Sequence, residues 1–297
     1  MLTPLDSRVS DINAENLGIG VRDLMGNAGK AVADFLIERF TGCKILFVCG
    51  PGNNGGDGFA AALRLNPAET SIALLCEPSK IHTSESRYYY SLLECTIARY
   101  SDDMLDNTDV IVDCALGTGA RGSIREPYAS FIKAANASGK TVISIDIPSG
   151  LGCNLAVRPQ YTITFMDVKE GMDQYNSGSI IIRDIGIPYE AYHTIGPGDM
   201  LRYPIPGPDS HKGQNGRLMI IAGGPYYGAP SMSSCSALRT GADIVRLFSP
   251  ESIHREVASC SPVLMITDLP GSILSRESVK FLLQESLNYD AVLIGPG

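Results

Sequence analysis

Short apolar runs alternate with helix-length segments along most of this sequence of 297 residues, and this alternation constrains the fold more than any other feature. The runs lie at residues 44–49, 71–76, 109–114, 141–145, 161–165 and 179–183, and a second series lies at 217–222, 243–248, 263–267 and 290–294. Helix-length segments at 58–65, 84–99 and 128–137 separate several of them. Continuous apolar strands are typical of parallel sheets that helices cover on both faces. The sequence therefore predicts an α/β protein.

The segment before the first run also has an apolar side. Between residues 11 and 40, seven apolar side chains share one helical face: Val21, Leu24, Met25, Ala28, Val32, Phe35 and Leu36. This spacing predicts one or two amphipathic helices that pack on the sheet.

A proline-rich segment at 203–210 separates the two series of runs and predicts a linker. We therefore expect one domain at residues 1–205 and a second at 206–297. The second series stops just after Ile294, on Gly295-Pro296-Gly297, where a loop and a covering helix would follow a central strand. On this ground we expect residues 206–297 to be the first part of a larger domain.

Composition excludes several classes of function. The formal net charge of −8 argues against nucleic acid as a partner, because binding to phosphate backbones requires clustered Lys and Arg. No apolar stretch is long enough to cross a bilayer, and the N-terminus does not resemble a signal peptide. The eight cysteines are scattered singly, which is typical of reduced thiols. We expect a cytoplasmic protein without a transition-metal site.

A glycine-rich loop follows the first run. Residues 50–55 satisfy the G-x-G-x-x-G pattern of dinucleotide-binding folds, and Glu77 lies at a distance suited to holding a ribose. The next residues argue against an ordinary dehydrogenase, because Asp57 on the first helical turn would repel a pyrophosphate there. A plain N-cap role for Asp57 remains open.

Two further polar loops follow later strands. Asp113 leads into a glycine-rich run at 117–123, whose N–H groups and Arg121 could hold a phosphate, and Asp146 leads into 147–150. In a parallel sheet all three loops emerge at the carboxyl edge, where such folds bind ligands. Simple turn or capping roles for these residues remain open.

Hard oxygen donors also follow the strands. If Asn54, Asp113 and Ser149 converge, they suit a cation such as K⁺, Na⁺ or Mg²⁺ better than zinc.

Three ordered motifs carry a resemblance to a known family. Residues 24–29 (LMGNAG), 48–59 (VCGPGNNGGDGF) and 146–150 (DIPSG) closely resemble the NAD(P)H-hydrate epimerases, which implies a Rossmann-like three-layer α/β/α domain. Residues 211–217 (HKGQNGR), 222–224, 227–230 and 237–242 resemble the ADP-dependent NAD(P)H-hydrate dehydratases of ribokinase-like fold. The resemblance implies the front of a bifunctional enzyme that repairs hydrated NADH and NADPH (NADHX and NADPHX).

The resemblance also implies roles for individual residues. It assigns Asp146 to substrate contact and acid–base catalysis, Lys169 to the same site, and Ala229 to substrate contact in the second half. Substrate binding in the first half falls on Asn53, Asn54, Gly55, Gly56 and Asp57, and on Gly117, Thr118, Gly119, Ala120, Arg121, Gly122 and Ser123. A potassium ion falls on Asn54, Asp113 and Ser149. The sequence departs from the family at Gly26, where glutamate is usual, and at 158–160.

The expected reaction is inversion at C6 between the R and S forms of the hydrate. ADP-dependent dehydration of the S form is expected of the full-length protein but not of this chain, because the family's catalytic Gly-x-Gly-Asp motif is absent from residues 206–297. We also expect a homo-oligomer. The alternatives are an NAD-dependent oxidoreductase that uses residues 50–55 and Glu77, a non-catalytic module of the same fold, and a sugar kinase.

Overall fold

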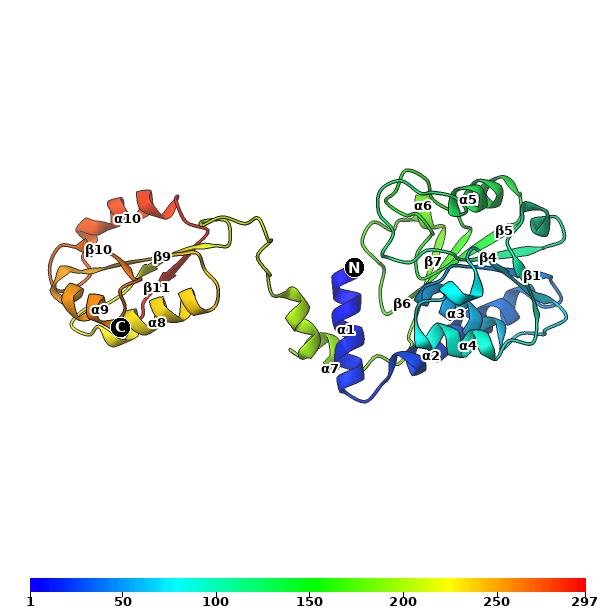
Figure 1. Cartoon of the computed structure of the whole chain (residues 1–297), viewed down its shortest axis with the longest axis horizontal. Helices are drawn as coiled ribbons and strands as arrows, with labels where there is room; N and C mark the ends of the chain where they lie inside the picture. The colour runs from blue at the N-terminus through cyan, green and yellow to red at the C-terminus, as the bar shows by residue number, and fades with distance from the viewer. The chain divides into compact units, whose positions relative to one another are not determined.

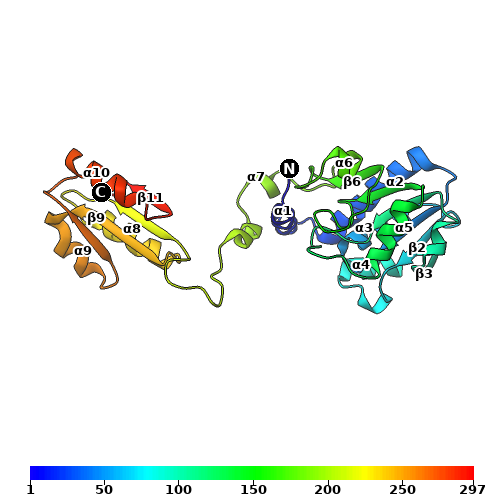
Figure 2. The same cartoon turned by 90° about the horizontal axis from the view of Figure 1, so that it is seen from above.

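The computed structural model describes residues 1–297 and divides the chain into two compact units, Met1–Tyr203 and Pro204–Gly297. Figures 1 and 2 show both units, which are described separately below. None of the helices combines the length and the apolar character that crossing a membrane requires.

The first unit is built on a seven-stranded sheet in which every neighbouring pair of strands is parallel. The strands are β1 (Ile45–Cys49), β2 (Thr70–Leu74), β3 (Thr96–Arg99), β4 (Val110–Cys114), β5 (Thr141–Ile145), β6 (Tyr161–Phe165) and β7 (Ser179–Arg183). Their order is β3-β2-β1-β4-β5-β6-β7. The order reverses between β1 and β4, and open α/β sheets bind ligands at such a switch point. The predicted Rossmann-like fold is confirmed.

Helices cover both faces of this sheet (Figure 1). Alternate β1 residues point to opposite faces, so Phe47 packs with Phe35 and Phe59, while Leu46 and Val48 pack on the other face. One face is covered by α2 (Val21–Phe40), α3 (Asn53–Ala62) and α4 (Ser84–Ser91), and the other by α5 (Tyr128–Ala137) and the 3₁₀ helix η2 (Asp102–Leu105). The remaining short helices before residue 188 are η1 (Pro78–Lys80) and α6 (Gln174–Ser177). The unit is thus a three-layer structure with two apolar cores.

Helix α1 (Pro4–Asn16) is tied to distant parts of the first unit. The backbone of Leu2 pairs with the loop after β6 through bonds to Val168 O and from Glu170 N. At the other end of the unit, α7 (Glu190–His193) and η3 (Pro197–Arg202) pack on α1. Arg202 forms an ion pair with Asp6 at 2.7 Å. These long-range contacts determine where α1 lies.

Three predicted elements differ from the structure. The segment 84–99, predicted as one helix, is α4 followed by the edge strand β3, so that prediction is wrong at its C-terminal end. The first helix begins at Pro4, where Thr3 and Asp6 form a capping box, and not near residue 11. Helix α3 begins at Asn53, five residues earlier than predicted.

The second unit contains a parallel sheet of four strands in the order β10-β9-β8-β11. Its elements are β8 (Arg217–Ile221), α8 (Gly228–Arg239), β9 (Ile244–Pro250), η4 (Glu251–Ile253), α9 (His254–Cys260), β10 (Met265–Leu269), η5 (Arg276–Ser278), α10 (Val279–Ser286) and β11 (Ala291–Ile294). Alternate β8 residues again enter two apolar clusters, with Ile220 in one and Met219 in the other. The second α/β series predicted from the sequence is therefore present.

We expect Gly29→Ala to destabilise the first unit by about 1–3 kcal/mol, because overpacking a close helix contact forces the backbone to shift. A Cβ at Gly29 on α2 would lie 2.5 Å from the backbone of Ala60 on α3. Denaturant unfolding of the purified protein measures the effect. Gly119→Ala is the matched control, since no atom lies within 4 Å of a Cβ there. Equal stability of both variants would contradict the prediction.

Candidate functional site

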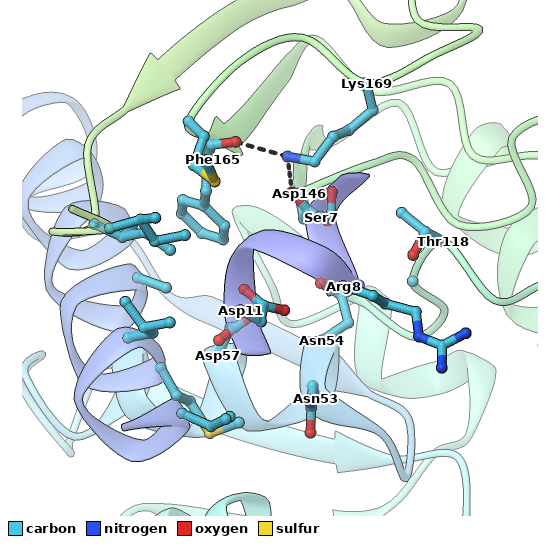
Figure 3. A pocket seen from close by; sticks show the side chains of 18 residues that line it. Ser7, Arg8, Asp11, Asn53, Asn54, Asp57, Thr118, Asp146, Phe165 and Lys169 are labelled. Atoms are coloured by element: carbon cyan, nitrogen blue, oxygen red, sulfur yellow. Dashed lines mark hydrogen bonds and ion pairs between the residues drawn. The ribbon is translucent and has the colours of Figure 1, made fainter. Parts of the chain in front are cut away.

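A cavity of about 240 Å³ opens at the carboxyl edge of the first sheet (Figure 3). It is lined by residues at or after the ends of β1, β4, β5, β6 and β7 and by one side each of α1 and α2. The lining residues are Ser7, Arg8, Asp11, Val21, Leu24, Met25, Ala28, Asn53, Asn54, Asp57, Gly117, Thr118, Asp146, Phe165, Met166, Lys169, Ile185 and Ile187. The cavity thus combines an apolar wall with a small set of polar and charged groups, as binding sites for small molecules do.

The glycine loop after β1 brings two backbone segments into direct contact. A Cβ at Gly50 would overlap the carbonyl oxygen of Ala115, and one at Gly55 would overlap the carbonyl oxygen of Gly50. The glycines therefore allow the loop after β1 to lie against the loop after β4. This contact carries Asn54 into the cavity wall, where its Nδ2 donates to the carbonyl oxygen of Leu116 at 3.1 Å.

Asp113 ties the loops after β4 and β5 together. Its side chain is fully buried and accepts hydrogen bonds from the Ser144 hydroxyl, from the backbone N–H and hydroxyl of Ser149, and from the Ala115 N–H. Burial raises the pKa of the Asp113 carboxyl, while these hydrogen bonds oppose that shift. The Ser149 hydroxyl also accepts from Leu116 N at 2.8 Å. Asn54, Asp113 and Ser149 therefore converge around Leu116.

Asp146 and Lys169 form a nearly buried ion pair in the cavity. Lys169 Nζ lies 2.7 Å from Asp146 Oδ1 and also donates to Phe165 O at 2.7 Å and to Thr164 Oγ1 at 3.1 Å. The Lys169 side chain is 6% exposed and that of Asp146 is 21% exposed. The lysine is thus held between the ends of two strands, and the carboxylate remains accessible from the cavity.

Asp146, which lines the cavity, has a left-handed backbone conformation that is unfavourable for a residue other than glycine. Asp146 has φ of 63°, and the Ile147 N–H donates to Ile145 O at 2.8 Å to close a γ-turn. Met166 repeats the arrangement at the end of β6, with φ of 66° and a bond from Asp167 N to Phe165 O. Such a conformation costs about 1–3 kcal/mol for a non-glycine residue and is concentrated at functional sites.

Asp11 and Asp57 place two further carboxyl groups in the cavity. Figure 3 shows them beside each other, Asp11 on α1 and Asp57 on α3. Burial, and then the charge of Asp146, raise the pKa of Asp11 to about 6, although Lys169 opposes this shift. Burial also raises the pKa of Asp57 well above its ordinary value, and the charges of Asp146 and Asp11 add to the effect. Neither carboxyl forms an ion pair with a basic side chain.

Comparison with known families identifies the first unit. Residues 21–171, half of the chain, match the family model described as YjeF-related protein N-terminus. The chain belongs to this YjeF-related family. Residues 218–297 match a second family model, described as NAD(P)H-hydrate dehydratase. The chain is therefore a YjeF-related domain followed by a segment of a second family.

Archaeal relatives match along nearly the whole chain. It is 40% identical to a protein of Methanothermobacter thermautotrophicus, in a match that covers 100% of this chain and 62% of the relative. It is 34% identical to a protein of Archaeoglobus fulgidus, with 98% of this chain and 64% of the relative covered. It is 36% identical to a protein of Methanospirillum hungatei, with 100% of this chain and 60% of the relative covered. All three are named bifunctional NAD(P)H-hydrate repair enzyme Nnr. The chain thus spans 60–64% of the length of these relatives.

The cavity of the YjeF-related domain brings together part of the predicted site. Asn53, Asn54, Asp57, Asp146 and Lys169 line it, together with Gly117 and Thr118 from the predicted phosphate loop. Thr118, Ala120, Arg121 and Gly122 line an adjoining cavity, which also contacts Lys169. Gly55, Gly56, Gly119 and Ser123 line neither cavity, and Ala229 begins α8 in the second unit.

Two of the alternative interpretations do not fit the structure. Asp57 is not an N-cap, because α3 begins with Gly52 as its cap and Asp57 lies one turn further along. Glu77, the candidate ribose ligand of an oxidoreductase, is in an exposed ion pair with Arg99 at 2.7 Å and does not line the cavity.

Sequence reasoning missed the contribution of α1 to the YjeF-related site. Ser7, Arg8 and Asp11 line the cavity at the spacing of one helical face. This helical spacing is the sequence signal that indicates that the three side chains share one face of a helix. Without the contacts of α1, however, nothing indicated that this face meets the edge of the sheet.

We expect Asp11→Asn to stabilise the protein at about pH 8 by at most about 3 kcal/mol, and to have little effect at about pH 4. The folded pKa of Asp11 is raised from 3.8 to about 6, so ionisation opposes folding once pH exceeds the unfolded value, and fully so above 6. Denaturant unfolding at both pH values tests this. Glu15→Gln, an exposed carboxylate on the same helix, is the control and should change stability little at either pH.

Proposed function

We propose that the first unit interconverts the R and S epimers of hydrated NADH and NADPH at C6 of the nicotinamide ring. The observation that carries this proposal is the Asp146–Lys169 ion pair in a cavity at the sheet's switch point, beside the glycine loop. The family match and the names of the relatives support the same substrate class.

The chemistry needs proton transfer near C6. The hydrate carries a hydroxyl beside a ring nitrogen and is a hemiaminal, so reversible breaking of a bond at C6 allows the stereocentre to invert. Asp146 projects from its γ-turn into the cavity and can accept or return that proton. Lys169, held by Phe165 O and Thr164 Oγ1, orients the carboxylate and stabilises its negative charge.

The rest of the dinucleotide requires a phosphate site next to the cavity. The adjoining cavity is the candidate that we choose, because Ala120, Arg121 and Gly122 line it and it shares Thr118 and Lys169 with the first. We place the nicotinamide beside Asp146 and the pyrophosphate along the loop 117–123. Backbone N–H groups and the Arg121 guanidinium would hold the phosphate oxygens.

The structure also supports a cation site beside the substrate. Asn54 Oδ1 is buried and has no hydrogen-bond partner, which is unusual for a buried amide oxygen. It lies on the side chain that bonds to Leu116 O, next to the Asp113 and Ser149 network. This donor set of neutral and carboxylate oxygens fits K⁺, which Asn54, Asp113 and Ser149 would hold. When bound, the ion would supply positive charge that orients the ribose and phosphates.

For the second unit, the match to the dehydratase model supports a role in ADP-dependent dehydration of the S epimer. We propose that activity for the full-length protein. The catalytic Gly-x-Gly-Asp motif is absent from residues 206–297, so we assign epimerisation alone to the residues described here.

We expect the purified chain to interconvert the two epimers without ADP, and Asp146→Ala to lower kcat at least about 100-fold, the usual contribution of a positioned acid–base group. Chromatographic separation of the epimers, starting from pure R hydrate, measures the rate. Asp34→Ala is the control, because this exposed α2 residue pairs only with Lys30 on the surface. Full activity of Asp146→Ala would refute the assignment, and hydride transfer to a carbonyl compound would favour an oxidoreductase.

We expect epimerisation to depend on K⁺ through Asn54. Replacing K⁺ by tetramethylammonium should raise KM for the hydrate, and Asn54→Ala should remove most of this dependence, since the buried oxygen is lost. The measurement is KM as a function of K⁺ concentration at constant ionic strength. Equal KM in the two salts for the unmodified protein would contradict the cation site.

A further inference from the structure

Asp11 is an ionisable residue in the cavity that the mechanism above does not use. It lies on α1 and lines the same cavity as Asp146. Figure 3 shows its carboxyl group next to that of Asp57, while Lys169 points to Asp146. The cavity therefore contains one ion-paired carboxyl, Asp146, and two further carboxyls, Asp11 and Asp57, that form no ion pair.

We propose that Asp11 and Asp57 form a second proton-transfer unit of the epimerase site, with Asp11 as the group that protonates the leaving hydroxyl at C6. This inference rests on the proposed function. It assigns a catalytic role to a helix that lies before the residues matched by the family model.

The charges around the pair favour a retained proton. The other charged residues that line the cavity are Arg8 on the same helix, whose guanidinium points away from the pair in Figure 3, and Asp146 and Lys169 from the loops after β5 and β6. Lys169 Nζ forms an ion pair with Asp146 Oδ1 at 2.7 Å. Arg8 forms no ion pair with the carboxyl of Asp11 or that of Asp57. Neighbouring carboxyls that pair with no basic side chain do not both ionise readily, which agrees with the raised pKa values of both groups.

Two proton carriers match the requirements of inversion at C6. In one direction, Asp11 gives its proton to the hydroxyl as the C6–O bond breaks, water leaves, and the lone pair of the ring nitrogen forms a C=N bond to C6. A water molecule then adds to the opposite face, the C=N electrons return to nitrogen, and Asp146 takes the proton released by that water. Return of this proton through solvent to Asp11 completes the cycle. Sites that assign acid and base roles commonly do so through carboxyls with contrasting environments.

The fold keeps Asp11 in this position by several contacts. Asn13, two residues nearer the C-terminus of α1, is buried, donates to Ala191 O at 3.0 Å and accepts from Gly198 N at 2.7 Å. The backbone pairing of Leu2 fixes the other end of the helix beside Lys169. The helix is therefore positioned by the same loop that carries the lysine of the first proton-transfer group.

Epimerisation kinetics test the role of Asp11. We expect Asp11→Asn to lower kcat about 100-fold with little change in KM, and to abolish the fall in kcat/KM that the unmodified protein shows as pH rises through the titration of the pair. Asp11→Glu should recover part of kcat, because it restores the acid. Glu15→Gln should behave as the unmodified protein. An Asp11→Asn variant with normal kcat and an unchanged pH profile would overturn the proposal.

A titration that does not depend on activity separates failure of this inference from failure of the proposed function. In ¹³C NMR of aspartate-labelled protein, with the Asp11 signal assigned by its loss in Asp11→Asn, we expect the Asp11 carboxyl to titrate near 6. Asp11→Asn should lower the pKa of the Asp57 carboxyl, whose signal is assigned by its loss in Asp57→Asn, because the charge of Asp11 raises that pKa. An Asp11 carboxyl that titrates near its ordinary value, or an Asp57 pKa that Asp11→Asn leaves unchanged, would refute the pair. If the titration is as expected but the unmodified protein does not epimerise the hydrate, the proposed function fails and the catalytic role of Asp11 fails with it.

Discussion

The hydrogen-bonded carboxyl of Asp113 is the constraint on which the candidate site depends. It lies at the end of β4, inside the sheet, and it accepts bonds from Ser144, Ser149 and Ala115. Through Ser149 and Leu116 this network extends to Asn54 on α3. Three loops from separate strands are thereby held together at the switch point. A buried carboxyl without hydrogen-bond donors costs free energy. The loops therefore have few other arrangements that would keep the Asp113 carboxyl hydrogen-bonded.

The distribution of charge in the cavity follows from the presence of more carboxyls than basic side chains that pair with them. Asp11, Asp57 and Asp146 all line it, yet Lys169 forms an ion pair with Asp146 alone. The lysine is anchored by Phe165 O and Thr164 Oγ1, so it is not free to serve the other carboxyls. One carboxyl thereby pairs with a lysine, while burial raises the pKa of the other two. Contrasting environments of similar carboxyls are a common way for a site to separate acid and base roles.

Most of the fold could be predicted from the sequence, because the buried parallel strands are continuous apolar runs. The strands β1, β4, β5, β6 and β7 lie where the pattern indicates, within a residue or so at their ends. The edge strand β3 was missed, since its residues Thr96–Arg99 are mostly exposed and carry no apolar run. The start of α1 at Pro4 depended on the capping box of Thr3 and Asp6, a local signal that hydrophobic periodicity does not contain.

By itself, the sequence determined the α/β class, the glycine loop and the presence of polar residues at the ends of β4 and β5. These features are local, because they follow from strand periodicity and from the small set of residues that a tight loop accepts. Only the tertiary structure decided that Asp146 meets Lys169, that Asn54 converges with Ser149, and that α1 brings Asp11 into the cavity. Those contacts join residues far apart in the chain, and pairings such as that of Leu2 with the loop after β6 leave no periodic trace in the sequence.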